Sequence, residues 1–89
     1  MLVEWSEQAL ESLDIIIGYL ADHNRLAAQQ LHTDIMETAT VLSLFPYMHK
    51  LGRVAGTREA IVTANYFMVY RVTHCVEILE VLHTRREYP

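Results

Sequence analysis

The sequence predicts a small α+β fold: an N-terminal strand, an antiparallel two-helix hairpin and then a three-strand antiparallel meander. Two observations predict it. Apolar residues of the first half recur with the period of a helix, whereas those of the second half form short runs rich in Val, Ile, Tyr and Phe. Because 89 residues suffice for only one core, we expect residues 1–89 to form a single domain.

The first strand is predicted within Met1–Trp5, a short apolar stretch. Ser6 is a suitable N-cap for the helix that follows, and Glu7 stands in the first turn, where the helix dipole favours an acid. The apolar stripe of this helix consists of Ala9, Leu10, Leu13, Ile16, Ile17 and Leu20. We expect the helix to end at Asp22-His23-Asn24.

Asn24 is predicted to cap a second helix, which Phe45-Pro46 ends because proline disfavours helical geometry in the residue before it. The stripe of this helix consists of Ala28, Leu31, Ile35, Ala39 and Leu42. A connection of about three residues between two amphipathic helices indicates an antiparallel hairpin.

Three strands are predicted after the loop Tyr47–Gly56, at Arg58–Val62, Tyr66–Thr73 and Val76–His83. The breaks between them are short, so consecutive strands should form hairpins and the three together a meander. Residues Tyr66–Thr73 are mostly apolar on both faces, which favours a central position in the sheet.

Charge is distributed unevenly along the chain. Residues 1–49 contain seven acidic residues and one basic residue, Arg25, whereas residues 50–89 contain four acidic and six basic residues. The formal net charge of −4 therefore conceals a C-terminal part with net charge +2. This asymmetry suggests that the C-terminal half meets an anionic group while the whole chain binds polyanions weakly.

Several classes of site and location are not expected. No apolar run approaches membrane-spanning length, so no membrane association is predicted. The single cysteine, Cys75, cannot form an internal disulfide, which fits a cytoplasmic protein. The histidines lack metal-ligand spacing and Cys75 has no partner thiol, so the sequence predicts no metal site and no cofactor.

Several segments, taken in order, resemble toxins of the RelE/ParE superfamily, the toxic components of bacterial type II toxin–antitoxin modules. They are Trp5-Ser6, Tyr19-Leu20, Leu44-Phe45-Pro46, Gly52-Arg53, Gly56-Thr57-Arg58-Glu59, Tyr70-Arg71-Val72 and the ending Val81-Leu82-His83-Thr84-Arg85-Arg86. The ending and the Gly56-x-Arg58 segment resemble the ParE-like, plasmid-stabilisation side of the superfamily. The resemblance covers nearly the whole chain and implies the fold predicted above.

The resemblance implies growth arrest by one of two mechanisms. ParE-like members inhibit DNA gyrase, whereas RelE-like members are mRNA interferases that cleave mRNA, usually in the ribosome; whether this chain is an enzyme stays open. The negative total charge and the single lysine, Lys50, favour gyrase over RNA. A third interpretation is a member that has lost toxicity and remains an antitoxin-binding or repressor partner.

The resemblance also implies a cognate antitoxin. Its extended segment is expected over the helical hairpin and the sheet, and operator DNA would be bound only through the antitoxin. The candidates for contacting the target or the antitoxin are Arg53, Arg58, Arg85, Arg86 and Tyr88. The plainer alternatives are an ion pair between Arg58 and Glu59, a soluble tail at Arg85-Arg86 and a mobile Tyr88.

A ribonuclease of this superfamily would need a base, an acid and a fixed positive charge around the scissile phosphate. By resemblance, Arg58, His83 and Arg85 would supply these groups, with Arg58 facing His83 across the sheet. The plainer alternative for His83 is a solvated or packing histidine at a strand end.

Overall fold

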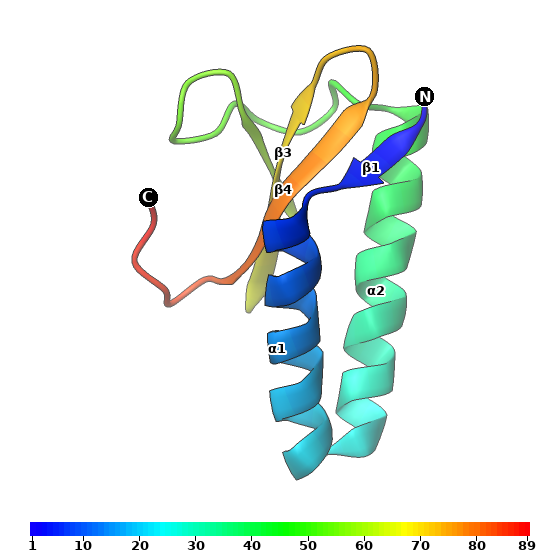
Figure 1. The fold of residues 1–89 in the computed structure, drawn as a ribbon, viewed down its shortest axis with the longest axis vertical. Coiled ribbons are helices and arrows are strands. Elements are labelled where there is room, and N and C mark those ends of the chain that lie inside the picture. The colour runs from blue at the N-terminus through cyan, green and yellow to red at the C-terminus, as the bar shows by residue number, and fades with distance from the viewer.

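The computed structural model describes residues 1–89 and contains six elements (Figure 1). They are β1 (Val3–Trp5), α1 (Glu7–His23), α2 (Arg25–Leu44), β2 (Arg58–Ile61), β3 (Tyr66–Val72) and β4 (Val76–His83). The predicted fold class and element order are confirmed, and the strand bounds agree to within two residues. The predicted helix connection was too long, because a single residue, Asn24, separates α1 from α2.

The sheet has the strand order β1-β4-β3-β2. The β2–β3 and β3–β4 pairs are antiparallel, as the predicted meander requires, whereas β1 runs parallel to β4 and makes the sheet mixed. Strand β3 is internal, as predicted. Strands β1 and β2 are left at the two edges of the sheet. The start of β2 is bridged to the preceding loop, since Leu51 pairs with Arg58 and the backbone N–H of Glu59 donates to the Lys50 carbonyl at 3.2 Å.

Both predicted N-caps are confirmed. The Ser6 hydroxyl accepts a hydrogen bond from the backbone N–H of Ala9 at 3.0 Å, and the Asn24 side-chain oxygen accepts one from Ala27 at 3.0 Å. The backbone N–H of Asn24 also donates to the carbonyl of Leu20 at 2.7 Å. One extended residue therefore ends α1 and begins α2, which makes the hairpin tight.

The helical hairpin covers one face of the sheet, with α1 packed along β4 and the two helices side by side (Figure 1). The core on this face consists of Ala9, Leu13, Leu31, Ile35, Ala39, Leu42, Ala60, Met68, Tyr70, Val76, Ile78 and Val81. It contains most of the predicted helical stripes. Leu10 is an exception, because it was predicted to be buried but its side chain is about half exposed to solvent.

The opposite face of the sheet, called here the outer face, has no helix over it. A small buried cluster of Phe67, Val69 and Leu82 lies there, with Leu79 and Tyr88 packed against it. The segment after β4 therefore turns back onto the outer face. Neither helix has the length and the apolar character that would let it cross a membrane.

Candidate functional site

Arg53 and Glu59 form a bidentate ion pair on the outer face. Nε and Nη2 of Arg53 donate to the Glu59 carboxylate at 2.9–3.2 Å, and the backbone N–H of Arg53 donates to the same group at 2.8 Å. Only 3% of Glu59 is exposed. The hydrogen bonds from Arg53 lower the pKa of Glu59 below its usual value despite this burial. The pair holds the loop before β2 against the sheet.

The predicted ion pair between Arg58 and Glu59 is wrong. Neighbouring residues of a strand point to opposite faces of the sheet, so the two side chains diverge. Glu59 faces the outer side and Arg53, whereas Arg58 is paired in register with Tyr70.

The guanidinium group of Arg53 also contacts two aromatic rings that pack edge-on against each other. Its central carbon is 5.1 Å from the ring centroid of Phe67 and 5.1 Å from that of Tyr88, and Nη1 donates to the Tyr88 carbonyl at 3.4 Å. Tyr88 is thus packed rather than mobile. Its burial, together with nearby Glu59, raises the pKa of Tyr88, so the phenol stays protonated at neutral pH. The structure brings together two predicted candidates, Arg53 and Tyr88.

Arg58 lies at the start of β2, and its guanidinium group is hydrogen-bonded to the loop after α2. Nη1 donates to the carbonyl of His49 at 2.8 Å and to that of Tyr47 at 3.4 Å. The Tyr70 hydroxyl, from the adjacent strand, donates to the carbonyl of Pro46 at 2.7 Å. These side-chain donors satisfy backbone carbonyls of the loop, which are not hydrogen-bonded within a helix or a strand. Arg58 therefore has a structural role in this loop.

His83 and the two following arginines lie at the other end of the sheet. Nδ1 of His83 accepts a hydrogen bond from the backbone N–H of Arg85 at 3.0 Å, and the ring packs edge-on against Tyr66. His83 and Arg86 border a small pocket of about 130 Å³ against Ile15 and Ile16 of α1. Arg85 and Arg86 are exposed, and neither has a carboxylate at ion-pair distance.

Arg58 and His83 do not face each other, so the predicted arrangement of Arg58, His83 and Arg85 is wrong. In register, Arg58 lies opposite Tyr70, whereas His83 lies opposite Tyr66. Four residues along the strands and two strand spacings across them separate their Cα atoms by about 16 Å. The reason is topological: the first and third strands of a meander are parallel, so the start of β2 cannot adjoin the end of β4.

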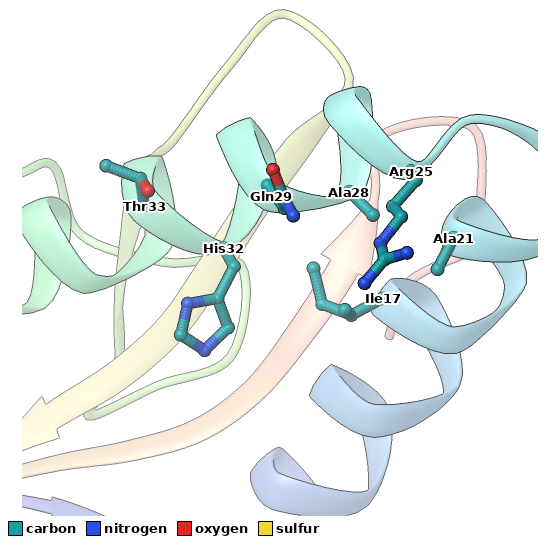
Figure 2. A pocket seen from close by; sticks show the side chains of 7 residues that line it. All are labelled: Ile17, Ala21, Arg25, Ala28, Gln29, His32 and Thr33. Carbon is teal, nitrogen blue, oxygen red and sulfur yellow. The ribbon is translucent and has the colours of Figure 1, made fainter.

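The largest pocket, about 410 Å³, is an open groove between the two helices (Figure 2). It is lined by Ile17, Ala21, Arg25, Ala28, Gln29, His32 and Thr33. Figure 2 shows the guanidinium group of Arg25 lying beside Ile17, with the His32 ring projecting from α2 farther along the groove. None of the predicted site residues lines this groove. The signal in the sequence was the seven-residue spacing of Arg25 and His32, which places both on one helix face.

The end of α2 and the loop after it expose a run of large apolar side chains, called here the loop patch. Its members are Leu44, Phe45, Tyr47, Met48 and Leu51, each more than half exposed. Ile61 on the edge strand β2 is exposed as well. The sequence interpretation assigned these residues no surface role, although apolar residues concentrated in a loop were the available signal. Such a patch is typical of a protein-binding surface.

Comparisons with known proteins agree with this architecture. Residues 3–88 match the family described as the ParE toxin of type II toxin–antitoxin system, parDE. The chain is 31% identical over 88 residues to the inferred toxin Y4kP of Sinorhizobium fredii (strain NBRC 101917 / NGR234), a match covering 98% of this chain and 92% of that protein.

Three solved structures share the fold. The chromosomal ParDE TA system from P. aeruginosa superposes with a TM-score of 0.81 at 20% identity, covering 93% of this chain and 95% of the other. A YoeB/ParE toxin from Agrobacterium tumefaciens gives 0.68 at 15% identity, with 99% and 100% covered. YafQ from E. coli strain BL21(DE3) gives 0.55 at 19% identity, with 93% and 92% covered. With the family match over residues 3–88, the chain belongs to the ParE toxins of type II toxin–antitoxin systems, within the RelE/ParE superfamily.

Proposed function

We propose that this toxin arrests growth by inhibiting DNA gyrase through a protein–protein contact, without cleaving RNA. The observation that carries the proposal is the separation of Arg58 from His83, which keeps the arginine of β2 from sharing a phosphate with the histidine at the end of β4. The guanidinium groups of Arg53 and Arg58 are both hydrogen-bonded within the fold. A net charge of −4 also disfavours binding among the phosphates of ribosomal RNA.

The segment after β4 is the part of the toxin that we assign to gyrase. Arg85 and Arg86 are exposed cations without ionic partners. Arg86 also borders a pocket with the exposed Ile15 of α1. Arginines beside exposed apolar side chains are common at the centres of protein interfaces. This segment therefore offers both charge and apolar area to a protein target.

A supercoiling assay with purified gyrase, ATP and relaxed plasmid tests the proposal. The wild-type toxin should inhibit supercoiling, and the double variant Arg85→Ala, Arg86→Ala should need at least about tenfold more toxin for the same inhibition. Arg25→Ala is the matched control, because it removes an exposed arginine from the opposite half of the chain. Unimpaired supercoiling with the wild-type toxin would remove gyrase as the target.

The ribonuclease alternative is tested by mapping mRNA ends in a translating extract. We expect intact mRNA. Cleavage that the wild-type toxin causes and His83→Ala abolishes would replace the gyrase proposal. Normal growth after induction without antitoxin would instead support a family member that has lost its toxicity.

We assign the loop patch and the Ile61 end of the β2 edge to the antitoxin. Lys50 and Leu51 already pair with the start of β2, so an extended segment can add to this edge only near Ile61 while its apolar side chains cover the loop patch. Phe45→Glu with Leu51→Glu should weaken capture of the antitoxin and restore growth arrest during co-expression. Leu26→Glu, at an equally exposed leucine outside the loop patch, is the control. Equal antitoxin capture by all three proteins would place the antitoxin elsewhere.

A further inference from the structure

Three potential metal ligands meet where β1 lies beside the turn between β3 and β4. Glu4 lies on β1, whereas His74 and Cys75 form the turn between β3 and β4. One ligand atom from each residue lies within 4.8 Å of the other two. The parallel pairing of β1 with β4, which sets Val3 opposite Val76, brings Glu4 to this turn.

The charges around this cluster favour a cation. Glu4 and Glu77 are paired in register, so the two carboxylates lie on the same side of the sheet. Glu77 is neutralised by Arg71 at 2.9 Å and accepts a hydrogen bond from Thr73 at 2.7 Å. The Glu4 carboxylate has no ion-pair partner. One carboxylate is therefore left uncompensated beside a thiol and an imidazole.

We propose that Glu4, His74 and Cys75 form a binding site for one divalent cation of the zinc class. Zn²⁺ accepts thiolate, imidazole and carboxylate ligands at about 2.0–2.3 Å and prefers tetrahedral geometry. In such a site the three ligand atoms would lie about 3.3–3.6 Å from one another. The side chains therefore need to close by about 1 Å, which small rotamer adjustments supply. A water molecule would complete the coordination.

The His74 imidazole also has a hydrogen-bonding partner outside the proposed ligand set. The Thr73 hydroxyl lies 3.4 Å from Nδ1 of His74 and donates to Glu77. A ligating histidine commonly has such a partner on its other ring nitrogen, which fixes the orientation of the ring. Cys75 is fully buried, whereas His74 and Glu4 are exposed. The cation would thus be covered on the core side by the thiol and approached from the surface.

The expected consequence is a link between β1 and the β3–β4 turn. Strand β1 has only three residues and pairs with a single neighbour, β4. Because the cation would bind the folded chain and not the unfolded one, it should raise thermal stability with increasing metal concentration.

Titration of the purified, metal-free chain with Co²⁺ tests the site. Cobalt reports on the zinc class because its thiolate complexes absorb through sulfur-to-metal charge transfer. We expect one cobalt per chain, displacement by Zn²⁺, and loss of the charge-transfer band in Cys75→Ser. His74→Gln and Glu4→Gln should each weaken binding by at least about 100-fold, since even second-layer partners contribute about 10- to 100-fold. His32→Gln, at an exposed histidine elsewhere, should bind as the wild type does.

If Cys75→Ser fails to fold, Glu4→Gln and His74→Gln still test the site. Both residues are exposed, so the amide replacements should leave the fold intact. Absence of a charge-transfer band in the folded wild-type chain would overturn the proposal. Wild-type affinity in both His74→Gln and Glu4→Gln would overturn it as well, because the metal would then bind elsewhere.

Discussion

Two pairs of arginines in the C-terminal half differ in what their guanidinium groups contact. Arg53 and Arg58, in the loop before β2 and at its start, donate to the Glu59 carboxylate and to loop carbonyls at 2.8–3.4 Å. Arg85 and Arg86, after β4, are exposed and form no ion pair. A charge count treats these residues alike, but only the second pair is available to a partner.

The local acceptors explain this difference. The loop before β2 folds against the sheet, where the buried Glu59 carboxylate and the carbonyls of the loop need hydrogen-bond donors. After His83 the backbone leaves the sheet, and the side chains of Arg85 and Arg86 are exposed with no carboxylate at ion-pair distance. Arg71 resembles Arg53 and Arg58 in this respect, because its guanidinium group lies 2.9 Å from the Glu77 carboxylate on the neighbouring strand. Arg85 and Arg86 are therefore two adjacent cations of the C-terminal half whose guanidinium groups are exposed and not held by a carboxylate.

The largest effect that we expect is loss of stability in Arg53→Ala. This change leaves the Glu59 carboxylate buried without its cation and removes the guanidinium group that packs on the rings of Phe67 and Tyr88. The thermal midpoint should fall by several degrees in a domain of this size. Arg53→Lys should recover part of the loss, since lysine keeps the charge but not the planar fork. A midpoint equal to that of the wild type would show that the pair is dispensable.

A smaller loss is expected for Tyr70→Phe. The Tyr70 hydroxyl donates to the carbonyl of Pro46 at 2.7 Å, next to the carbonyls that Arg58 holds. Removing a buried donor and leaving its acceptor unpaired costs about 1–3 kcal/mol of unfolding free energy. Tyr47→Phe is the matched control, because its ring is largely exposed. Urea unfolding should separate the two variants, and equal midpoints would contradict a holding role for Tyr70.

The fold was predictable because its signals are local. Ser6 and Asn24 act as N-caps through their own turns, and Phe45-Pro46 ends α2 through steric contacts between adjacent residues. Leu10 was misassigned because the apolar stripe is wider than the part that the sheet covers.

The candidate site was less predictable because it depends on register between distant segments. Arg58 and Glu59 are adjacent in sequence, yet Glu59 pairs with Arg53 because strand neighbours diverge. The relative position of Arg58 and His83 follows from strand order, which no spacing along the chain encodes. The grouping of Glu4 with Cys75 was hidden for the same reason, since it follows from the parallel pairing of β1.

Lowering the pH should weaken the Arg53–Glu59 ion pair without removing either side chain, so we expect a smaller loss of stability than in Arg53→Ala. Hydrogen bonds from Arg53 lower the pKa of Glu59 from 4.5, so the folded state favours the carboxylate. The stabilisation is complete above about pH 4.5 and is lost as the pH falls through the lower pKa of the folded state. The stability difference between the wild type and Glu59→Gln should therefore be constant above about pH 4.5 and shrink as the pH falls below it. A constant difference would mean that the carboxylate charge contributes nothing.

The smallest effect on stability belongs to the segment after β4. Arg85→Ala should change the unfolding free energy by less than about 0.5 kcal/mol, because the side chain is exposed and has no ionic partner. The hydrogen bond to His83 comes from the Arg85 backbone, which alanine retains. Urea unfolding of Arg85→Ala beside Arg53→Ala measures the contrast directly. If both variants lost similar stability, the arginines after β4 would contribute to the stability of the fold. A loss of gyrase inhibition in the Arg85→Ala, Arg86→Ala variant could then no longer be ascribed to a binding surface.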